Sequence, residues 1–214
     1  MKIAFFHGLE SKPGSGKEKF LQSSGDAYTP AMDYKSNFSF QNLLKEVKKR
    51  KIDLLVGSSM GGWTAYALST HTGIPTILFN PAVQGRAFDP DINLGSKSAK
   101  HTVVLGKTDD VIDPKKTEEW IKKNGKGSFS INYENIGHRT PINVFKKWLS
   151  PKMNESFGRV MLFEQFMSSL NEAEDRTAEP DEEVWKSWKE LVNMTPAQIK
   201  QFRDGAGKDA GLTQ

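Results

Sequence analysis

The sequence predicts a three-layer α/β domain, in which a mostly parallel sheet lies between two layers of helices, followed by a helical C-terminal appendage. Two observations predict this organisation. Short apolar runs typical of buried strands alternate along the chain with longer segments of helical periodicity, which favours parallel strands joined by crossover helices. The charge balance also changes near Pro151: residues 1–150 carry 22 basic and 14 acidic side chains, and residues 151–214 carry 8 and 12.

The α/β domain is expected to span residues 1–150. In chain order, the expected strands lie near residues 2–7, 26–31, 52–57, 75–80, 101–106 and 128–134, and the expected helices near residues 39–50, 61–72, 114–124 and 141–149. In open parallel sheets the functional residues gather at the carboxyl ends of the strands. We therefore expect the site residues directly after these strands.

Residues 151–214 are expected to form two or three short amphipathic helices. Their apolar side chains recur at near-helical spacing in two stripes: Phe157, Met161, Phe166 and Leu170, then Val184, Trp188, Leu191 and Val192. Such apolar faces must be buried against the α/β domain, against one another or on a partner. The sequence therefore leaves open a protein partner or self-association through these C-terminal helices.

A sharp turn is expected at Gly57-Ser58-Ser59-Met60-Gly61, between an apolar strand and a helix. The pattern Gly-x-Ser-x-Gly in this context is typical of a nucleophile elbow, because small residues on both sides let the chain turn tightly and expose one serine hydroxyl above the sheet. The pentapeptide alone is a weak signal. It makes Ser59 the candidate nucleophile, which needs a base and an acid elsewhere in the chain.

The candidate base and acid follow in the order expected after a nucleophile elbow. His138 lies on a loop beyond the strand at 128–134, and it is the one histidine that follows an acidic strand-end loop. That loop offers Asp109, Asp110 and Asp113 after the strand at 101–106. Asp109 is preferred because it lies nearest the strand end, which would leave Val111 and Ile112 to pack inward.

The first strand ends in His7-Gly8-Leu9, where an oxyanion hole is expected. One oxyanion-hole amide commonly comes from the loop after an early strand, and the other from the residue after the nucleophile. The backbone N–H groups of Leu9 and Met60 are therefore the candidate donors. Because backbone atoms would bind the oxyanion, the side chains at these two positions matter little.

Gly14-Ser15-Gly16-Lys17 resembles the end of a phosphate-binding loop, but the positions that complete that motif hold Ser11 and Glu18. These residues are instead expected to form a flexible, basic rim. The chain contains no cysteine, which excludes thiol catalysis and cysteine-ligated zinc. No cofactor and no metal is expected.

Five segments together resemble the α/β-hydrolase superfamily and, within it, its small, lidless YqiA-like esterases. The resemblance covers about residues 1–150 and implies that the aspartate opening Asp-x-Val is the triad acid, which supports Asp109 over Asp110. A weaker resemblance, over Trp185 to Leu212, is to helical segments of tailed-bacteriophage proteins. The five segments are His7 to Pro13, Gly57 to Gly62, Phe79 to Val83, Asp109 to Asp113 and Gly137-His138.

The sequence thus predicts a serine hydrolase that cleaves small acyl esters or thioesters through an acyl-enzyme, with Ser59, His138 and Asp109 as the triad. The alternative is a hydrolase-fold binding or assembly protein that docks a partner through its C-terminal helices. The basic run at residues 45–51 lacks interleaved aromatic residues, so a nucleic-acid partner is not expected. The apolar runs are too short to span a bilayer, so no membrane partner is expected. We expect a cytoplasmic location, which would be the host cytoplasm if the protein is viral.

Overall fold

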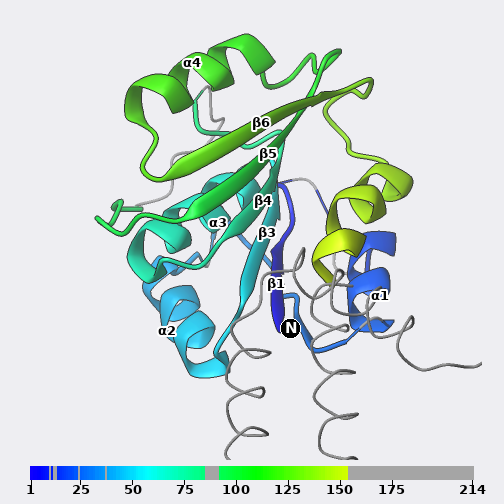
Figure 1. The fold of residues 1–214 in the computed structure, drawn as a ribbon. Helices are drawn as coiled ribbons and strands as arrows, with labels where there is room; N and C mark the ends of the chain where they lie inside the picture. Colours follow the sequence, from blue (N-terminus) through cyan, green and yellow to red (C-terminus); the bar gives the residue numbers. More distant parts are fainter. Residues whose placement is uncertain (10, 12–13, 24, 37, 85–91, 154–214) are drawn as a thin grey trace, which may run out of the picture. The chain divides into compact units, whose positions relative to one another are not determined.

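The computed structural model describes residues 1–153, except for residues 10, 12–13, 24, 37 and 85–91 (Figure 1). The chain divides into two compact units, Met1–Pro151 and Lys152–Gln214. The predicted C-terminal helices fall outside the described residues. In the first unit the strands are β1 (Ile3–Phe6), β2 (Ala27–Tyr28), β3 (Leu54–Ser58), β4 (Thr76–Phe79), β5 (Lys100–Gly106) and β6 (Ser128–Glu134), and the helices are α1 (Gly16–Ser23), α2 (Phe40–Arg50), α3 (Met60–Thr72) and α4 (Pro114–Asn124). A further helical segment begins at residue 142.

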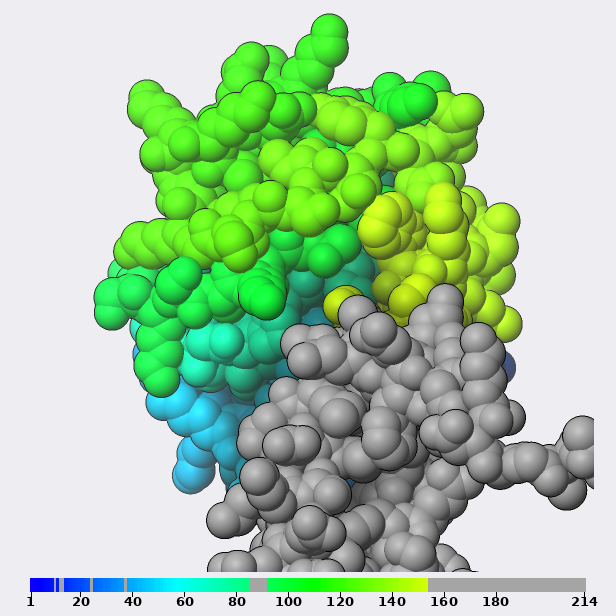
Figure 2. All heavy atoms as spheres, viewed as in Figure 1, coloured from blue at the N-terminus to red at the C-terminus, as the bar shows by residue number. Residues whose placement is uncertain are grey.

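The six strands form one sheet in the order β2-β1-β3-β4-β5-β6, and every neighbouring pair is parallel. Because all strands point the same way, the loops that follow β3, β4, β5 and β6 meet at one edge of the sheet. The space-filling view shows β6 at the surface, in green shading toward yellow, as expected of an edge strand whose residues are exposed or half-buried (Figure 2). The predicted α/β fold class is confirmed.

Helices cover both faces of the sheet, as the ribbon shows (Figure 1). On one face, Phe6, Leu55, Leu78 and Val103 pack in a core with residues of α2, α3 and α4. Side chains of neighbouring positions in a strand point to opposite faces. On the other face Phe145, in the segment that begins at residue 142, contacts rings of β1 and β4 at centroid distances of 5.3 and 5.2 Å. This two-sided burial explains why the strands are nearly continuous apolar runs.

Helix α1 is the main departure from the expected elements, because Gly16 and Lys17 belong to it instead of to a flexible rim. Hydrogen bonds of Ser15 and Glu18 start the helix: the Glu18 N–H donates to Ser15 Oγ at 3.4 Å, as at an N-cap, and the Glu18 carboxylate accepts from the Gly14 N–H. Lys17 is half-buried, with its amine 5.6 Å from the centre of the Phe145 ring, and burial lowers its pKa to about 8. The expectation of a flexible, basic rim at these residues is therefore wrong.

Strand β2 is the second departure, since it spans two residues where six were expected. It pairs with β1 at the edge of the sheet through Ile3 with Ala27 and Ala4 with Tyr28. Of the helices that the structure describes, none combines the length and apolar character needed to cross a bilayer.

His101 is a buried histidine with a structural environment, far from the loops at the carboxyl edge. Its Nε2 lies 2.9 Å from the Lys126 carbonyl oxygen and its Nδ1 lies 3.0 Å from Thr76 Oγ1. The ring also stacks on Phe129 at a centroid distance of 4.5 Å. Nε2–H donates to the carbonyl, so Nδ1 accepts from the threonine hydroxyl and the imidazole is neutral.

We expect stability to fall in mild acid because of His101. Burial lowers the pKa of His101 below its ordinary value of 6.5, and the bond to the Lys126 carbonyl only partly opposes that shift. The unfolded chain therefore binds a proton that the folded chain resists, so the contribution is complete above about pH 6.5 and is lost as the pH falls through the lowered value. Urea denaturation of wild type and His101→Phe between about pH 8 and about pH 5 measures it. An equally steep decline in His101→Phe would contradict the assignment.

Candidate active site

The turn between β3 and α3 places Ser59 in an unusual backbone conformation. Ser59 has φ 55° and ψ −120°, and it stands at the N-cap of α3 without using its side chain to cap the helix. A non-glycine residue with positive φ is uncommon and persists only where the surroundings hold it. The Ser59 N–H donates to the Phe79 carbonyl at 2.9 Å, and its carbonyl accepts from the Ala82 N–H at 3.0 Å. Residues at the end of β4 and just after it thus hold both the N–H and the carbonyl of Ser59.

Close backbone packing explains the two glycines of the elbow. A Cβ at Gly61 would lie 1.9 Å from the Phe6 carbonyl oxygen, and a Cβ at Gly57 would lie 2.1 Å from the Gly61 carbonyl oxygen. Both distances are far below any real carbon–oxygen contact. Only glycine therefore lets α3 begin directly against the ends of β1 and β3.

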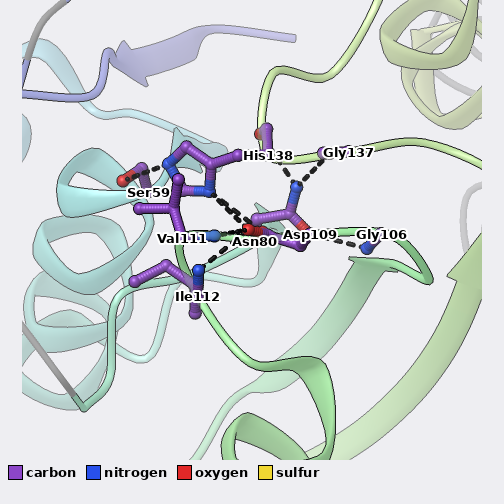
Figure 3. A network of polar contacts seen from close by, with 8 residues as sticks. All are labelled: Ser59, Asn80, Gly106, Asp109, Val111, Ile112, Gly137 and His138. Carbon is purple, nitrogen blue, oxygen red and sulfur yellow. Dashed lines mark hydrogen bonds and ion pairs between the residues drawn. The ribbon is translucent and has the colours of Figure 1, made fainter.

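The structure brings Ser59, His138 and Asp109 together at the carboxyl edge of the sheet (Figure 3). His138 Nε2 lies 3.1 Å from Ser59 Oγ, and His138 Nδ1 lies 2.9 Å from Asp109 Oδ2. The Asp109 carboxylate is fully buried, whereas the His138 side chain is 20% exposed. A carboxylate that accepts from Nδ1–H leaves Nε2 free to accept a proton from the serine hydroxyl.

The three candidate acids occupy different environments. Asp109 Oδ1 accepts hydrogen bonds from the N–H groups of Val111 and Ile112 at 2.9 and 2.8 Å, which fix the carboxylate toward His138. Asp113 instead caps α4, accepting from Lys115 and Lys116 backbone N–H groups. Asp110 is exposed. Geometry therefore favours Asp109, as the sequence does.

Val111 does not pack inward as expected. Its side chain is 62% exposed, whereas that of Ile112 is buried. Because both N–H groups turn toward the Asp109 carboxylate, the chain bends tightly there and the two side chains cannot face the same way. An exposed apolar side chain therefore lies on the loop that carries the candidate acid.

The loop after β1 lies against Ser59, as the candidate oxyanion hole requires. A Cβ at Gly8 would lie 3.2 Å from the Ser59 Cβ. His7 holds this loop: its Nε2 accepts from the Met32 N–H at 3.2 Å, so the proton is on Nδ1, which donates to the Gly8 carbonyl at 2.8 Å. The N–H groups of Leu9 and Met60 follow directly on Gly8 and Ser59, so both candidate donors lie on backbone adjoining the serine.

Asn80 is a residue of the site that the sequence did not single out by role. It is 1% exposed, has φ 44°, and its side-chain amide contacts Gly106, Gly137 and His138 (Figure 3). The signal available in the sequence was a polar residue at the end of the apolar strand expected near residues 75–80. Polar residues at that edge of a parallel sheet are candidates for the site.

Comparison with protein families finds one match, to the uncharacterised protein family UPF0227, over residues 2–95. These residues contain the first strand, the loop after it and the elbow, but they are less than half of the chain. A comparison with curated proteins finds no match.

Solved structures share the arrangement of strands and helices. A Xanthomonas campestris pv. campestris protein assigned to the α/β superfamily of hydrolases is 18% identical, with a TM-score of 0.51, over 67% of this chain and 90% of that one. The chain has the α/β-hydrolase fold. Est1E from Butyrivibrio proteoclasticus is 14% identical (TM-score 0.51; 73% and 88% covered), and mouse alpha/beta hydrolase domain-containing protein 10 is 13% identical (TM-score 0.53; 72% and 88% covered).

The family match and these structures confirm the resemblance to α/β hydrolases that the sequence predicts, including their YqiA-like group. At such low identity the structures establish the fold, and a shared fold leaves the activity to be argued from the site. In this α/β-hydrolase fold, Ser59 follows β3, Asp109 follows β5 and His138 follows β6.

Proposed function

We propose that the protein is a serine hydrolase that cleaves small acyl esters or thioesters, with Ser59, His138 and Asp109 as its catalytic triad. One observation carries the proposal: a single imidazole is within hydrogen-bond distance of Ser59 Oγ through Nε2 and of Asp109 Oδ2 through Nδ1. A serine hydroxyl that contacts a base, which in turn contacts a buried acid, is the arrangement that acyl transfer needs.

The proposed reaction has two stages. Ser59 Oγ attacks the acyl carbon while His138 Nε2 takes the hydroxyl proton, and the bond to the leaving alcohol or thiol breaks as His138 returns that proton to it. Water then attacks the acyl-enzyme while His138 Nε2 takes a proton from it; the bond between the acyl carbon and Ser59 Oγ breaks as His138 returns that proton to Oγ, which releases the acid and restores Ser59. The backbone N–H groups of Leu9 and Met60 stabilise the negative charge that develops on the carbonyl oxygen at each attack.

The surroundings of the site support a substrate with an apolar group. Val111 exposes most of its side chain on the loop that also carries Asp109, so it offers apolar surface beside the triad. Burial of a methylene group against such surface contributes roughly 0.8 kcal/mol. Acyl groups of a few carbons are therefore the first substrates to test.

Reaction with a fluorophosphonate probe tests the proposal directly. We expect the probe to label Ser59 and no other serine, because only a serine beside a base and an oxyanion hole reacts quickly. Mass spectrometry of the labelled peptide distinguishes Ser59 from Ser58. Wild type should also hydrolyse 4-nitrophenyl acetate, and Ser59→Ala should not. Ser58→Ala is the matched control and should keep the activity. Label on Ser58, or turnover by Ser59→Ala, would reject the proposed nucleophile.

The alternative role, docking of a partner through C-terminal helices, concerns residues outside the described part of the chain. The cytoplasmic location and the bacteriophage resemblance likewise stay predictions from the sequence. Because Ser59, His138 and Asp109 contact one another, we propose the enzyme and not the binding protein.

A further inference from the structure

We propose that Asn80 is a positioning residue that ties the loop carrying the acid to the loop carrying the base. This inference rests on the proposed function, because it assigns a role in the proposed triad. Asn80 is the first residue after β4, the strand that lies between β3, which leads to Ser59, and β5, which leads to Asp109. It belongs to the segment at residues 79–83 whose role the triad itself does not explain.

All the hydrogen-bonding groups of the Asn80 side-chain amide are used, and they reach both loops (Figure 3). Asn80 Nδ2 donates to the Gly137 carbonyl at 3.1 Å and to the His138 carbonyl at 2.9 Å. Asn80 Oδ1 accepts from the Gly106 N–H at 2.7 Å. One N–H and two carbonyls surround the amide, so only this orientation of its oxygen and nitrogen satisfies every partner.

The link from Asn80 to the acid passes through Gly106. The Gly106 N–H donates to Asn80 Oδ1, and the Gly106 carbonyl accepts from the Asp109 N–H at 3.2 Å. Gly106 is also packed closely on the base loop, since a Cβ there would lie 2.5 Å from the Ile136 carbonyl oxygen. The two loops therefore meet at Gly106, and the Asn80 amide joins them by hydrogen bonds.

The link from Asn80 to the nucleophile passes through its neighbours in the chain. Phe79 and Ala82 hydrogen-bond the Ser59 N–H and carbonyl at 2.9 and 3.0 Å. The Asn80 N–H itself donates to the Val104 carbonyl at 2.9 Å, which anchors the turn to β5. One short segment thus contacts the backbone of Ser59, of the base and of the strand that leads to the acid.

Asparagine fits this position for two reasons. Its backbone adopts positive φ, which asparagine tolerates better than most residues. Its amide also carries two donors and an acceptor on one short side chain, whereas aspartate would place an oxygen against the two carbonyls. The buried carbonyls of Gly137 and His138 would then face an acceptor instead of a donor.

Loss of the amide should loosen His138 relative to Asp109 and Ser59 while leaving the reacting groups present. A displacement of about 1 Å in a reacting geometry can cost about 10²-fold in rate. Because the Asn80 side chain is buried and its amide bonds backbone groups, substrate affinity should change little. The expected signature is a fall in kcat with KM nearly unchanged.

Two variants and a matched control test the role. Asn80→Gly removes the whole side chain and accepts positive φ without strain. Asn80→Asp keeps the size and the bond from Gly106, and replaces the donors to the base loop with a carboxyl oxygen. Thr76→Val is the control, because Thr76 is a buried hydrogen-bonding residue at the other end of the same strand, bonded to His101.

Turnover of 4-nitrophenyl acetate and the proton resonance of His138 Nδ1–H are the two measurements. That resonance lies far downfield when the proton bonds a carboxylate, and its loss in His138→Gln assigns it. We expect both Asn80 variants to lose about 10²-fold in kcat, to change KM less than about twofold and to lose or shift the resonance. Thr76→Val should keep kcat and the resonance.

The outcomes separate the two proposals. If wild type neither hydrolyses the ester nor reacts with the phosphonate probe, the proposed function fails, and the resonance alone then decides whether Asn80 positions His138. Wild-type kcat and an unchanged resonance in folded Asn80→Gly would overturn the positioning role. If neither Asn80 variant folds while Thr76→Val does, Asn80 is needed for folding and the positioning role is rejected.

Discussion

Asp109→Asn should lower ester turnover by about 10⁴-fold, as expected for the acid of a serine triad. The oxygen of the substituted amide can still accept from the Val111 and Ile112 N–H groups, as Asp109 Oδ1 does now at 2.9 and 2.8 Å. The amide nitrogen would then replace Oδ2, which lies 2.9 Å from His138 Nδ1 against 3.1 Å for Oδ1, and donate to that nitrogen. Since Nδ1 would become an acceptor, the proton would move to Nε2, which then cannot accept the proton of Ser59.

The neighbouring acids provide matched controls for this variant. Asp110→Asn should leave both turnover and stability unchanged, because its side chain is exposed. Asp113→Asn should leave turnover unchanged and alter stability by no more than about 1 kcal/mol, because asparagine replaces aspartate well at an N-cap. The values of kcat/KM for the three variants decide the matter. Near-normal activity in Asp109→Asn, with a large loss in either neighbour, would show that the triad acid is assigned wrongly.

The parts of the fold that the sequence predicts well are those whose burial is two-sided. Strands β1, β3, β4 and β5 are almost entirely buried, so their apolar residues form continuous runs that stand out from the chain around them. Two members of the candidate triad could be found for the same reason, because Ser59 and Asp109 come soon after such runs, whereas His138 follows the half-exposed edge strand β6. Order along the chain then sufficed to choose among the histidines.

The parts that were missed depend on local contacts without an apolar pattern. Helix α1 is short and has few apolar residues, and its start rests on hydrogen bonds of Ser15 and Glu18. The orientation of Val111 depends on a tight turn around a carboxylate, which periodicity does not detect. The role of Asn80 depends on residues 26 to 58 positions away in the chain, so no local pattern could reveal it.

Gly61→Ala should disrupt both the elbow and the loop that precedes the candidate oxyanion hole. The added Cβ would lie 1.9 Å from the Phe6 carbonyl oxygen and 2.6 Å from that of His7. These atoms are backbone of β1, which is paired on both sides, and of the residue after it, so they cannot rotate away as a side chain could. Overpacking of a well-filled site typically lowers the free energy of unfolding by about 1–3 kcal/mol. Because backbone must move here, we expect a loss of at least that size.

The same displacement separates Ser59, at the start of α3, from Leu9, which follows β1, so turnover should fall by about 10²-fold or more even if the variant folds. Gly16→Ala is the matched control: nothing lies within 4 Å of a Cβ there, and it is likewise in the first turn of a helix. Urea denaturation and turnover of 4-nitrophenyl acetate compare the two. The control should match wild type in turnover and should be as stable as wild type or more stable by up to about 1 kcal/mol. If Gly61→Ala also matched wild type, the close approach of α3 to β1 would not be what shapes the nucleophile elbow.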